Sequence, residues 1–227
     1  MFEYISYDMI EAIWYYLLFN ITFYLSNAIL FVLDYYQIIP DEKINIQDNQ
    51  SILSIYKKCL PCVLFNTLIA SWLPCLIMAW YKSDTNTTNT AISEFSLVKC
   101  VFDILISMPI ADVFLYTSHR LFHIPFLYKK FHKQHHEILT PIGLSAVYMT
   151  TTDFYFGNIL PIFLPMYIMN AHTITIKIWL VMIILNTTFL AHSGYRVANY
   201  HNKHHSLFNK NYGAHVFMDR LFGTYSD

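Results

Sequence analysis

Eleven histidines occur in this chain of 227 residues, and most of them fall into three short groups. His119 and His123 are four residues apart, which places both imidazoles on one face of a helix. The stretches His132–His136 (HKQHH) and His201–His205 (HNKHH) share one pattern, a histidine followed by two more at the third and fourth positions after it. His192 stands alone, shortly before the second of these stretches. The repeated spacing in separate stretches predicts one binding site assembled from several segments.

Imidazole is a borderline ligand that suits iron, zinc and copper, and its neutral nitrogens can hold two divalent ions without excess negative charge. A tetrahedral zinc takes only four ligands, so a site with this many histidines fits two metal ions better. Paired iron can bind oxygen and generate an oxidant that breaks an unactivated C–H bond, which no amino-acid side chain can do. The candidate ligands are His119, His123, His132, His135, His136, His192, His201, His204 and His205.

Two further histidines lie outside the pattern. His172 comes 20 residues before His192, and a straight helix would separate the two by roughly 30 Å. We therefore expect His172 not to join the same metals. His215 lies outside any ligand spacing and is expected to be structural.

An acid on the same helix as the first histidine pair is a candidate partner for it. Asp112 and Tyr116 lie seven and three residues before His119, along one helix face. A carboxylate one or two turns before a ligand can accept the other ring N–H and fix the tautomer of the imidazole. We therefore expect Asp112, with Tyr116 beside it, to support the ligands. Asp153 and Asp219 are weaker candidates of the same kind.

The composition places these histidines in a membrane protein. Hydrophobic residues make up 56% of the chain and charged residues 13%, against a usual charged share of about 25%. The net charge of −1 and the lack of a basic stripe argue against a nucleic acid partner.

Spanning a membrane takes roughly 20 apolar residues as helix, and five stretches approach that length. They cover approximately residues 9–33, 60–80, 97–116, 144–169 and 173–191. The third contains Lys99, Asp103 and Asp112, and the fourth contains Pro161 and Pro165, so a bend or a partial span is expected there. The predicted fold is an all-α integral membrane protein with four to five transmembrane helices.

Basic residues accumulate on the cytoplasmic side of membrane proteins. With a lumenal N-terminus and five crossings, most of the Lys and Arg residues fall on the cytosolic side, and so do all nine candidate ligands. The sequon that begins at Asn86 then lies in a lumenal loop, where glycosylation is possible. The arrangement predicts a metal site that faces the cytosol.

The ordered motifs resemble those of the fatty acid hydroxylase/sterol desaturase superfamily over residues 97–227. They are Asp112–His123 (DVFLYTSHRLFH), His132–His136 (HKQHH), His192–Tyr195 (HSGY), His201–His205 (HNKHH), Asn211–Gly213 (NYG) and Asp219–Thr224 (DRLFGT). The resemblance implies a multi-pass protein of the endoplasmic reticulum membrane, with N-terminal transmembrane helices and a lumenal loop in residues 1–96 and a di-iron catalytic domain in residues 97–227. It further implies that the same nine histidines hold two iron ions, and that electrons come from NAD(P)H through cytochrome b5 or a similar carrier.

Within the superfamily, HSGY with a terminal DRLFGT looks most like the C-4 methylsterol oxidase and cholesterol 25-hydroxylase branch. That branch usually has a Tyr-Ala-His-Pro-x-Glu stretch, where this chain reads YMTTTD over Tyr148–Asp153. The proline expected after HSGY is missing, Met218 replaces a tryptophan before Asp219, and the connection from His192 to His201 is short. These departures affect the substrate end and leave the candidate ligands intact.

Three functions compete on this sequence. The leading hypothesis is an O2-dependent monooxygenase or desaturase that acts on a sterol or long-chain lipid, in sterol or lipid biosynthesis. The alternative is a non-catalytic relative that retains the metals and binds lipid or acts as a scaffold. A metal transporter is disfavoured, because the histidines gather at one membrane face instead of along a conduction path.

Overall fold

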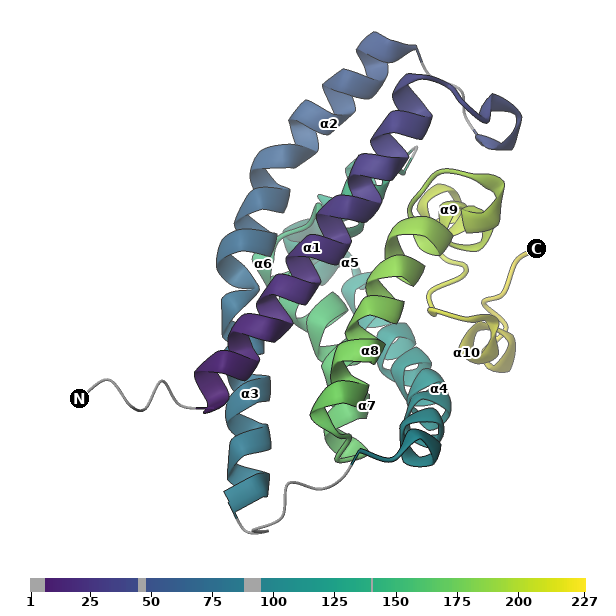
Figure 1. The fold of residues 1–227 in the computed structure, drawn as a ribbon. Helices are drawn as coiled ribbons and strands as arrows, with labels where there is room; N and C mark the ends of the chain where they lie inside the picture. The colour runs from purple at the N-terminus through teal and green to yellow at the C-terminus, as the bar shows by residue number, and fades with distance from the viewer. Residues whose placement is uncertain (1–6, 45–47, 88–94, 140) are drawn as a thin grey trace.

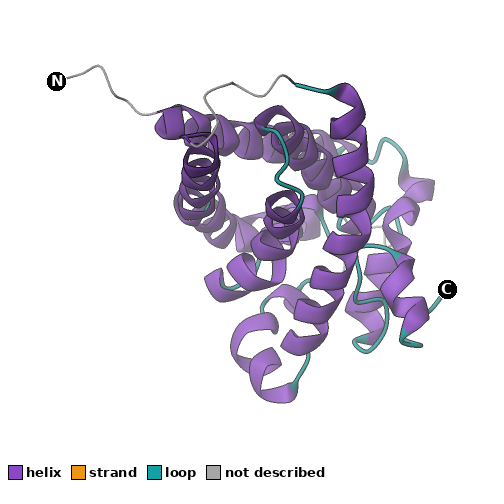
Figure 2. Cartoon of the chain, turned by 90° about the horizontal axis from the view of Figure 1, so that it is seen from below, coloured by secondary structure: helices purple, strands orange, loops and turns teal. Residues whose placement is uncertain are grey.

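The computed structural model describes residues 7–44, 48–87, 95–139 and 141–227. Throughout these residues the regular elements are helices joined by loops, and the extended pairing is limited to one bridge between Lys43 and Tyr195 (Figure 2). The predicted all-α class is therefore confirmed. The sequon that begins at Asn86 ends at Thr88, and residues 88–94 lie outside the described residues.

The N-terminal part consists of two long helical rods that lie against each other (Figure 1). Helix α1 (Tyr7–Tyr35) is followed by the short 3-10 helix η1 (Pro40–Glu42). The second rod consists of α2 (Asn49–Leu64), the π-helical segment η2 (Phe65–Ala70) and α3 (Trp72–Thr87). Asp48 caps its start by accepting the N–H of Ser51 at 2.8 Å, which satisfies one of the free donors of the first turn.

Three helical stretches are long and apolar enough to cross a membrane, among the residues that the structure describes: Asp8–Tyr35, Asn49–Lys82 and Thr173–Ala191. They correspond to the first, second and fifth predicted spans. Helix α1 shows why a membrane suits them, because it buries Phe19 and Phe23 but leaves Ile21 and Leu25 about 60% exposed. A helix that is apolar on its outer face as well requires lipid around it.

The third and fourth predicted spans take different forms. The third is a continuous helix, α4 (Leu97–Phe122), which fully buries Asp103 and Asp112. The fourth is divided into the 3-10 helix η5 (Gly143–Val147), α6 (Thr151–Asp153), the π-helical η6 (Phe154–Ile159) and α7 (Leu160–Ile168). Its last three segments form one helical run beside α4 and α8 (Figure 1). Among the described residues, length and composition therefore qualify three helices as spans, where the sequence predicted four to five.

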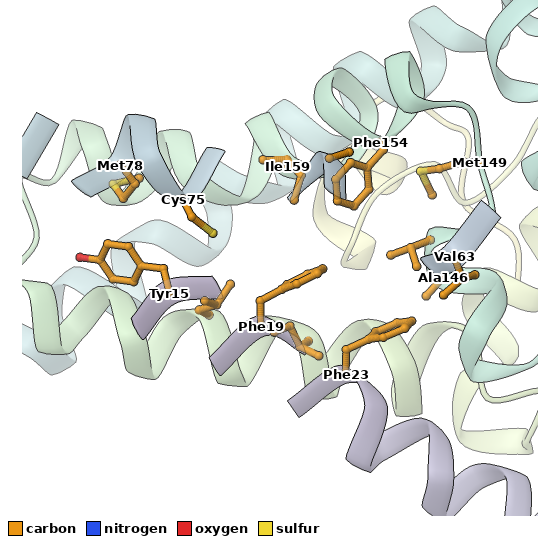
Figure 3. Close-up of a cluster of buried hydrophobic side chains, with 14 of the residues drawn as sticks. Tyr15, Phe19, Phe23, Val63, Cys75, Met78, Ala146, Met149, Phe154 and Ile159 are labelled. Atoms are coloured by element: carbon orange, nitrogen blue, oxygen red, sulfur yellow. The ribbon is translucent and has the colours of Figure 1, made fainter. Parts of the chain in front are cut away.

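A core of buried apolar side chains joins the N-terminal rods to this divided segment. Phe19 and Phe23 of α1 face Val63 of α2, Met149 and Phe154 across the centre of the molecule (Figure 3). Because these side chains come from both halves of the chain, the N-terminal helices pack as part of one body with the C-terminal half.

Short elements near one end of the bundle complete the fold, and most of the histidines lie in or beside them. Helix α8 (Thr173–Leu185) and its π-helical continuation η7 (Asn186–Ala191) lead to the second group of histidines. The short elements are α5 (Pro125–Leu127), η3 (Tyr128–His132), η4 (His135–Glu137), η8 (Arg196–Ala198), α9 (Asn199–Leu207) and α10 (Val216–Leu221).

Candidate metal centre

All nine candidate ligands converge, and they form two sets. Within each set, one potential ligand atom from every residue lies within 4.8 Å of the others. The first set contains His119, His123, His132, His136 and His204. The second set contains His135, His192, His201 and His205.

Each HxxHH motif contributes to both sets. On α9, His204 turns to the first set while His201 and His205 turn to the second. His132 and His136 likewise belong to the first set and His135 to the second. Each motif therefore supplies ligands to both sets and holds the two sets side by side, which is the arrangement that a pair of neighbouring ions requires.

The hydrogen bonds on the outer ring nitrogens fix where the protons lie. His132 Nδ1 is 2.7 Å from the carboxylate of Asp153, and His204 Nδ1 is 2.7 Å from the carbonyl oxygen of Lys210. Both partners are acceptors, so each Nδ1 carries the proton and each Nε2 presents a lone pair. His136 Nε2 lies 3.1 Å from both of these Nε2 atoms and can donate to only one. A cation is the partner that satisfies all three.

The second set shows the same need for a cation. His192 Nδ1 donates to the Thr187 carbonyl at 3.0 Å, so its Nε2 lone pair faces His135 Nε2 at 3.4 Å. His201 Nε2 and both ring nitrogens of His205 are buried without a hydrogen-bond partner among the described residues. Nitrogens about 2.1 Å from a common metal lie about 3 Å apart at right angles, which fits these spacings. The residues present therefore fit a pair of metal ions.

Burial keeps these imidazoles neutral. It lowers the pKa of His119 and His192 to about 4 and that of His136 to about 3, because a charged ring loses its hydration there. For His136 the neighbouring imidazoles, His119 first, lower the pKa further. The neutral ring is the form that binds a metal, so no proton has to be displaced at neutral pH.

Asp153 is the carboxylate that contacts an imidazole directly. Its bond to His132 joins the YMTTTD stretch to the HKQHH motif, and both side chains are buried. The sequence favoured Asp112 for this task, but Asp112 accepts the backbone N–H groups of His215 at 2.8 Å and Met218 at 3.1 Å. It therefore holds the start of α10, about two helix turns away from His119.

Asp112 acts on the site through the C-terminal segment, together with Asp219. Asp219 accepts the N–H groups of Tyr212 at 3.0 Å and Gly213 at 2.7 Å, which fixes this turn. The Tyr212 carbonyl in turn lies 2.7 Å from His119 Nδ1. A Cβ atom at Gly213 would lie 2.6 Å from the backbone carbonyl oxygen of His215 and 2.6 Å from the Asp112 carboxylate, so this close approach favours glycine.

Tyr116 belongs to the same support. Its hydroxyl lies 3.1 Å from the Thr224 hydroxyl and accepts an N–H of Arg120 at 2.7 Å. Its ring meets the ring of Tyr212 edge-to-face, with centroids 5.9 Å apart. Tyr116 thus packs the terminal segment against α4 and touches no ligand nitrogen in the described contacts.

A buried ion pair that sequence reasoning missed holds the segment after His192. Lys43 Nζ lies 2.6 Å from Asp34 and also donates to the Ser193 carbonyl at 2.8 Å. The Tyr195 hydroxyl donates to the same Asp34 carboxylate at 2.9 Å. Gly194, between Ser193 and Tyr195, has φ +72°, a conformation that glycine adopts without strain. Asp34 of α1 and Lys43, which follows η1, therefore hold the segment after His192 across 150 or more residues of sequence, and no spacing rule connects them.

His172 and His215 stay outside both sets, as predicted. His172 caps α8 by accepting the N–H of Ile174 at 3.1 Å, at the far end of the helical run that leads to His192. His215 contributes its backbone N–H to Asp112 and its carbonyl to the Tyr200 hydroxyl.

A cavity of about 420 Å³ opens beside the histidines. It runs from His119, His135 and His201 between α4, α7 and α8, and Met108 and Trp179 line its far part. Most of its lining is apolar, as in sites that bind small apolar molecules. A ligand with a long hydrocarbon body would bring part of that body close to both histidine sets.

The fold and the site together define a class of protein: an all-helical membrane protein with a paired cluster of buried histidines beside an apolar cavity. A family model described as fatty acid hydroxylase matches residues 104–224. The chain belongs to this family, and the superfamily that its motifs indicated is confirmed.

Three curated relatives show the range of the similarity. "Fatty acid hydroxylase domain-containing protein 2" of Homo sapiens is 29% identical over 216 residues, which cover 89% of this chain and 63% of that protein. "Fatty acid hydroxylase ahd1" of Mycosarcoma maydis is 32% identical over 180 residues, or 76% and 46% of the two chains. "Methylsterol monooxygenase 2-2" of Arabidopsis thaliana is 33% identical over 138 residues, or 53% and 51%.

The chain thus spans about half to two thirds of the length of these relatives. No solved structure matches it significantly. The C-4 methylsterol oxidase branch is not established, because relatives with other names align over more of the chain.

The two-set arrangement predicts the metal content of variants. We expect His204→Ala, in the first set, and His205→Ala, in the second, each to lower bound metal from two ions per chain towards one. Plasma emission spectrometry on the purified protein measures this, with His172→Ala as the control that keeps both ions. Full stoichiometry in both variants would refute the assignment of ligands.

The bond between His132 and Asp153 predicts a weaker metal site when the carboxylate is neutralised. Removing such an outer partner typically costs about 10- to 100-fold in metal affinity, because the imidazole loses its orientation and basicity. We expect Asp153→Asn to show this loss in a chelator titration, while Asp41→Asn, in the exposed η1, leaves the affinity unchanged. Equal affinities for the two variants would contradict the role of Asp153.

The buried ion pair predicts a loss of stability when its cation is removed. Lys43→Met leaves the buried Asp34 without its cation and with the Tyr195 hydroxyl as a donor, and breaking a buried ion pair typically costs about 3–5 kcal/mol. We expect a clearly lower melting temperature in detergent, with Lys57→Met, an exposed lysine of α2, as the matched control. If both variants melt like the unmodified protein, the ion pair does not hold this segment.

Proposed function

We propose that the protein is a membrane-bound non-haem di-iron oxidoreductase that uses O2 to hydroxylate or desaturate a lipid. The observation that carries this proposal is the convergence of nine neutral imidazoles, eight of them buried and His123 half-buried, in two sets at the end of an apolar cavity. Membership of the fatty acid hydroxylase family supports it.

The nine histidines would hold two iron ions, one in each set. Bound iron would supply the reduction of O2 and the cleavage of an unactivated C–H bond. The chain keeps the ligands in place through the acceptors on their outer nitrogens, such as Asp153 on His132 and the Thr187 carbonyl on His192. Asp112 and Tyr116 act as positioning residues, through the segment that carries Tyr212.

Hydroxylation inserts one oxygen atom of O2 into a C–H bond of the lipid and reduces the other oxygen atom to water. In addition to the lipid and O2, it consumes two electrons and two protons. Desaturation removes two hydrogens from the lipid and needs the same two electrons. We propose NAD(P)H as their source, delivered by cytochrome b5 or a similar carrier. Lys129 and Lys130 precede the HKQHH motif and Lys133 lies within it. These lysines would present positive charge to an acidic carrier.

We further propose that the protein lies in the endoplasmic reticulum membrane with the histidines towards the cytosol. Residues 97–227 would form the catalytic domain and residues 1–96 the N-terminal transmembrane helices with a lumenal loop. The distribution of basic residues supports this orientation.

The substrate class that fits the cavity is a sterol or a long-chain lipid. The relatives' names include a fatty acid hydroxylase and a methylsterol monooxygenase, so both classes occur among similar proteins. A cavity of this size and apolar lining suits either.

The orientation predicts opposite reactivities for two engineered cysteines. In sealed microsomes, and on a background without the four native cysteines, we expect a cysteine at position 86 to react only after the membrane is opened. A cysteine at position 226 should react with an impermeant reagent from outside at once. Labelling of both positions from the same side would overturn the proposed topology.

The proposed reaction is tested by turnover of lipid. Cells with the active protein should accumulate a lipid that carries one more oxygen or one more double bond, detected by mass spectrometry, and His204→Ala should abolish this product. The purified protein with iron, NAD(P)H, a reductase and cytochrome b5 should consume O2 only with the lipid present.

The second candidate is a non-catalytic relative that retains its metals and binds lipid. It is favoured if the protein with two irons and a competent reductase forms no product from any lipid extract while it still binds lipid.

A further inference from the structure

Two asparagines interrupt the apolar wall of the cavity. Asn158 and Asn186 both line it, while its far part is lined by apolar side chains such as Met108, Ile162 and Trp179. An amide in such surroundings costs free energy unless it is hydrogen-bonded. Their presence therefore calls for a partner.

Both asparagines lie in π-helical segments that also place groups of the metal centre. Asn158 belongs to η6, which directly follows Asp153, and Asn186 begins η7, which leads to His192. A π-helical turn inserts an extra residue into a helix, changes the face that its side chains present, and occurs frequently at functional sites. At roughly 1.5 Å per residue, Asn186 lies within about 9 Å of His192 along the helix. The amides are therefore in the part of the cavity next to the histidines.

The hydrogen bonds of the two side chains leave capacity for a ligand. Asn158 Nδ2 donates to the Ala146 carbonyl at 3.2 Å, and its Oδ1 accepts no hydrogen bond from the described residues. The Asn186 side chain is half-buried and makes no hydrogen bond within the described parts of the chain. An amide offers two donors and an acceptor, so the pair can serve a hydroxyl or a carbonyl group.

We infer that Asn158 and Asn186 form a polar subsite that hydrogen-bonds the oxygen-bearing end of a lipid, an alcohol or a carbonyl, whose hydrocarbon body fills the apolar far part of the cavity. This binding mode places the carbons next to the polar group beside the histidines. The inference rests on the proposed function for its consequence, that the lipid is oxidised near its polar end and not in the middle of its chain.

Binding of paired lipids tests the subsite without any turnover. One pair is 1-octadecanol and octadecane, and the other is cholesterol and 5α-cholestane; each pair differs by a single hydroxyl. Affinities are measured by equilibrium dialysis of the metal-loaded protein in nanodiscs, and the ratio within a pair is compared between variants so that partition into the bilayer cancels. We expect the unmodified protein to favour the alcohol of at least one pair about tenfold, as one hydrogen bond in an apolar site typically provides.

The decisive variant is Asn186→Leu, which keeps the number of side-chain heavy atoms and the branched shape and breaks no hydrogen bond within the described residues. In this variant the preference for the alcohol over the hydrocarbon should fall close to the value for nanodiscs without protein. Binding of the hydrocarbon and the metal content should stay unchanged. Asn186→Ser should keep part of the preference, and Asn158→Leu should lower it as well. Asn49→Leu, the same change at an exposed position of α2, is the matched control.

If the unmodified protein prefers 1-octadecanol over octadecane, the cavity takes a hydrocarbon chain. If it prefers cholesterol over 5α-cholestane, the cavity takes a ring system. An unchanged preference in Asn186→Leu combined with Asn158→Leu, or no preference in the unmodified protein, overturns the subsite. If the preference depends on the asparagines but no lipid is oxidised, the subsite stands and the proposed oxidation fails.

Discussion

Nine neutral imidazoles, eight of them buried and His123 half-buried, bring ring nitrogens with lone pairs close together, and this constraint governs the rest of the structure. Without positive charge between them, the Nε2 atoms of His132 and His204 and their neighbour on His136 cannot all be satisfied at 3.1 Å. The fold must therefore force the rings together and, where an acceptor lies on Nδ1, keep the tautomer that presents Nε2. It does so with acceptors outside the cluster, a carboxylate for His132 and backbone carbonyls for His119, His192 and His204.

These acceptors come from different parts of the chain, so the site depends on the whole fold. The Tyr212 carbonyl is in place because Asp219 fixes its turn and Asp112 holds the start of α10. The segment after His192 is in place because the ion pair of Asp34 and Lys43 reaches it from the N-terminal helix. Buried charges are costly, and each of these carboxylates is compensated by several hydrogen bonds or by a cation. The polar groups buried around the cluster thus form its rigid support.

The membrane accounts for the remaining architecture. The helices expose many apolar side chains outward, and a cavity continues from the histidines between α4, α7 and α8. In the proposed reaction, a lipid would place its hydrocarbon body there without leaving apolar surroundings, so the reacting carbon would need only to be held at the cavity end next to the rings. The two π-helical segments η6 and η7 border that end and join the cavity wall to Asp153 and His192.

The sequence by itself determined the helical membrane class, the family, the nine histidines and the exclusion of His172, because composition and spacing along one helix are local properties. Only the tertiary structure decided how the nine divide into five and four, since each HxxHH motif faces both sets. It also decided that Asp153 contacts an imidazole while Asp112 holds backbone N–H groups. Helical spacing says which side chains share a face, but which partner that face meets depends on packing between segments. The pairing of Lys43 with the Ser193 carbonyl, 150 residues away, is set by that packing alone.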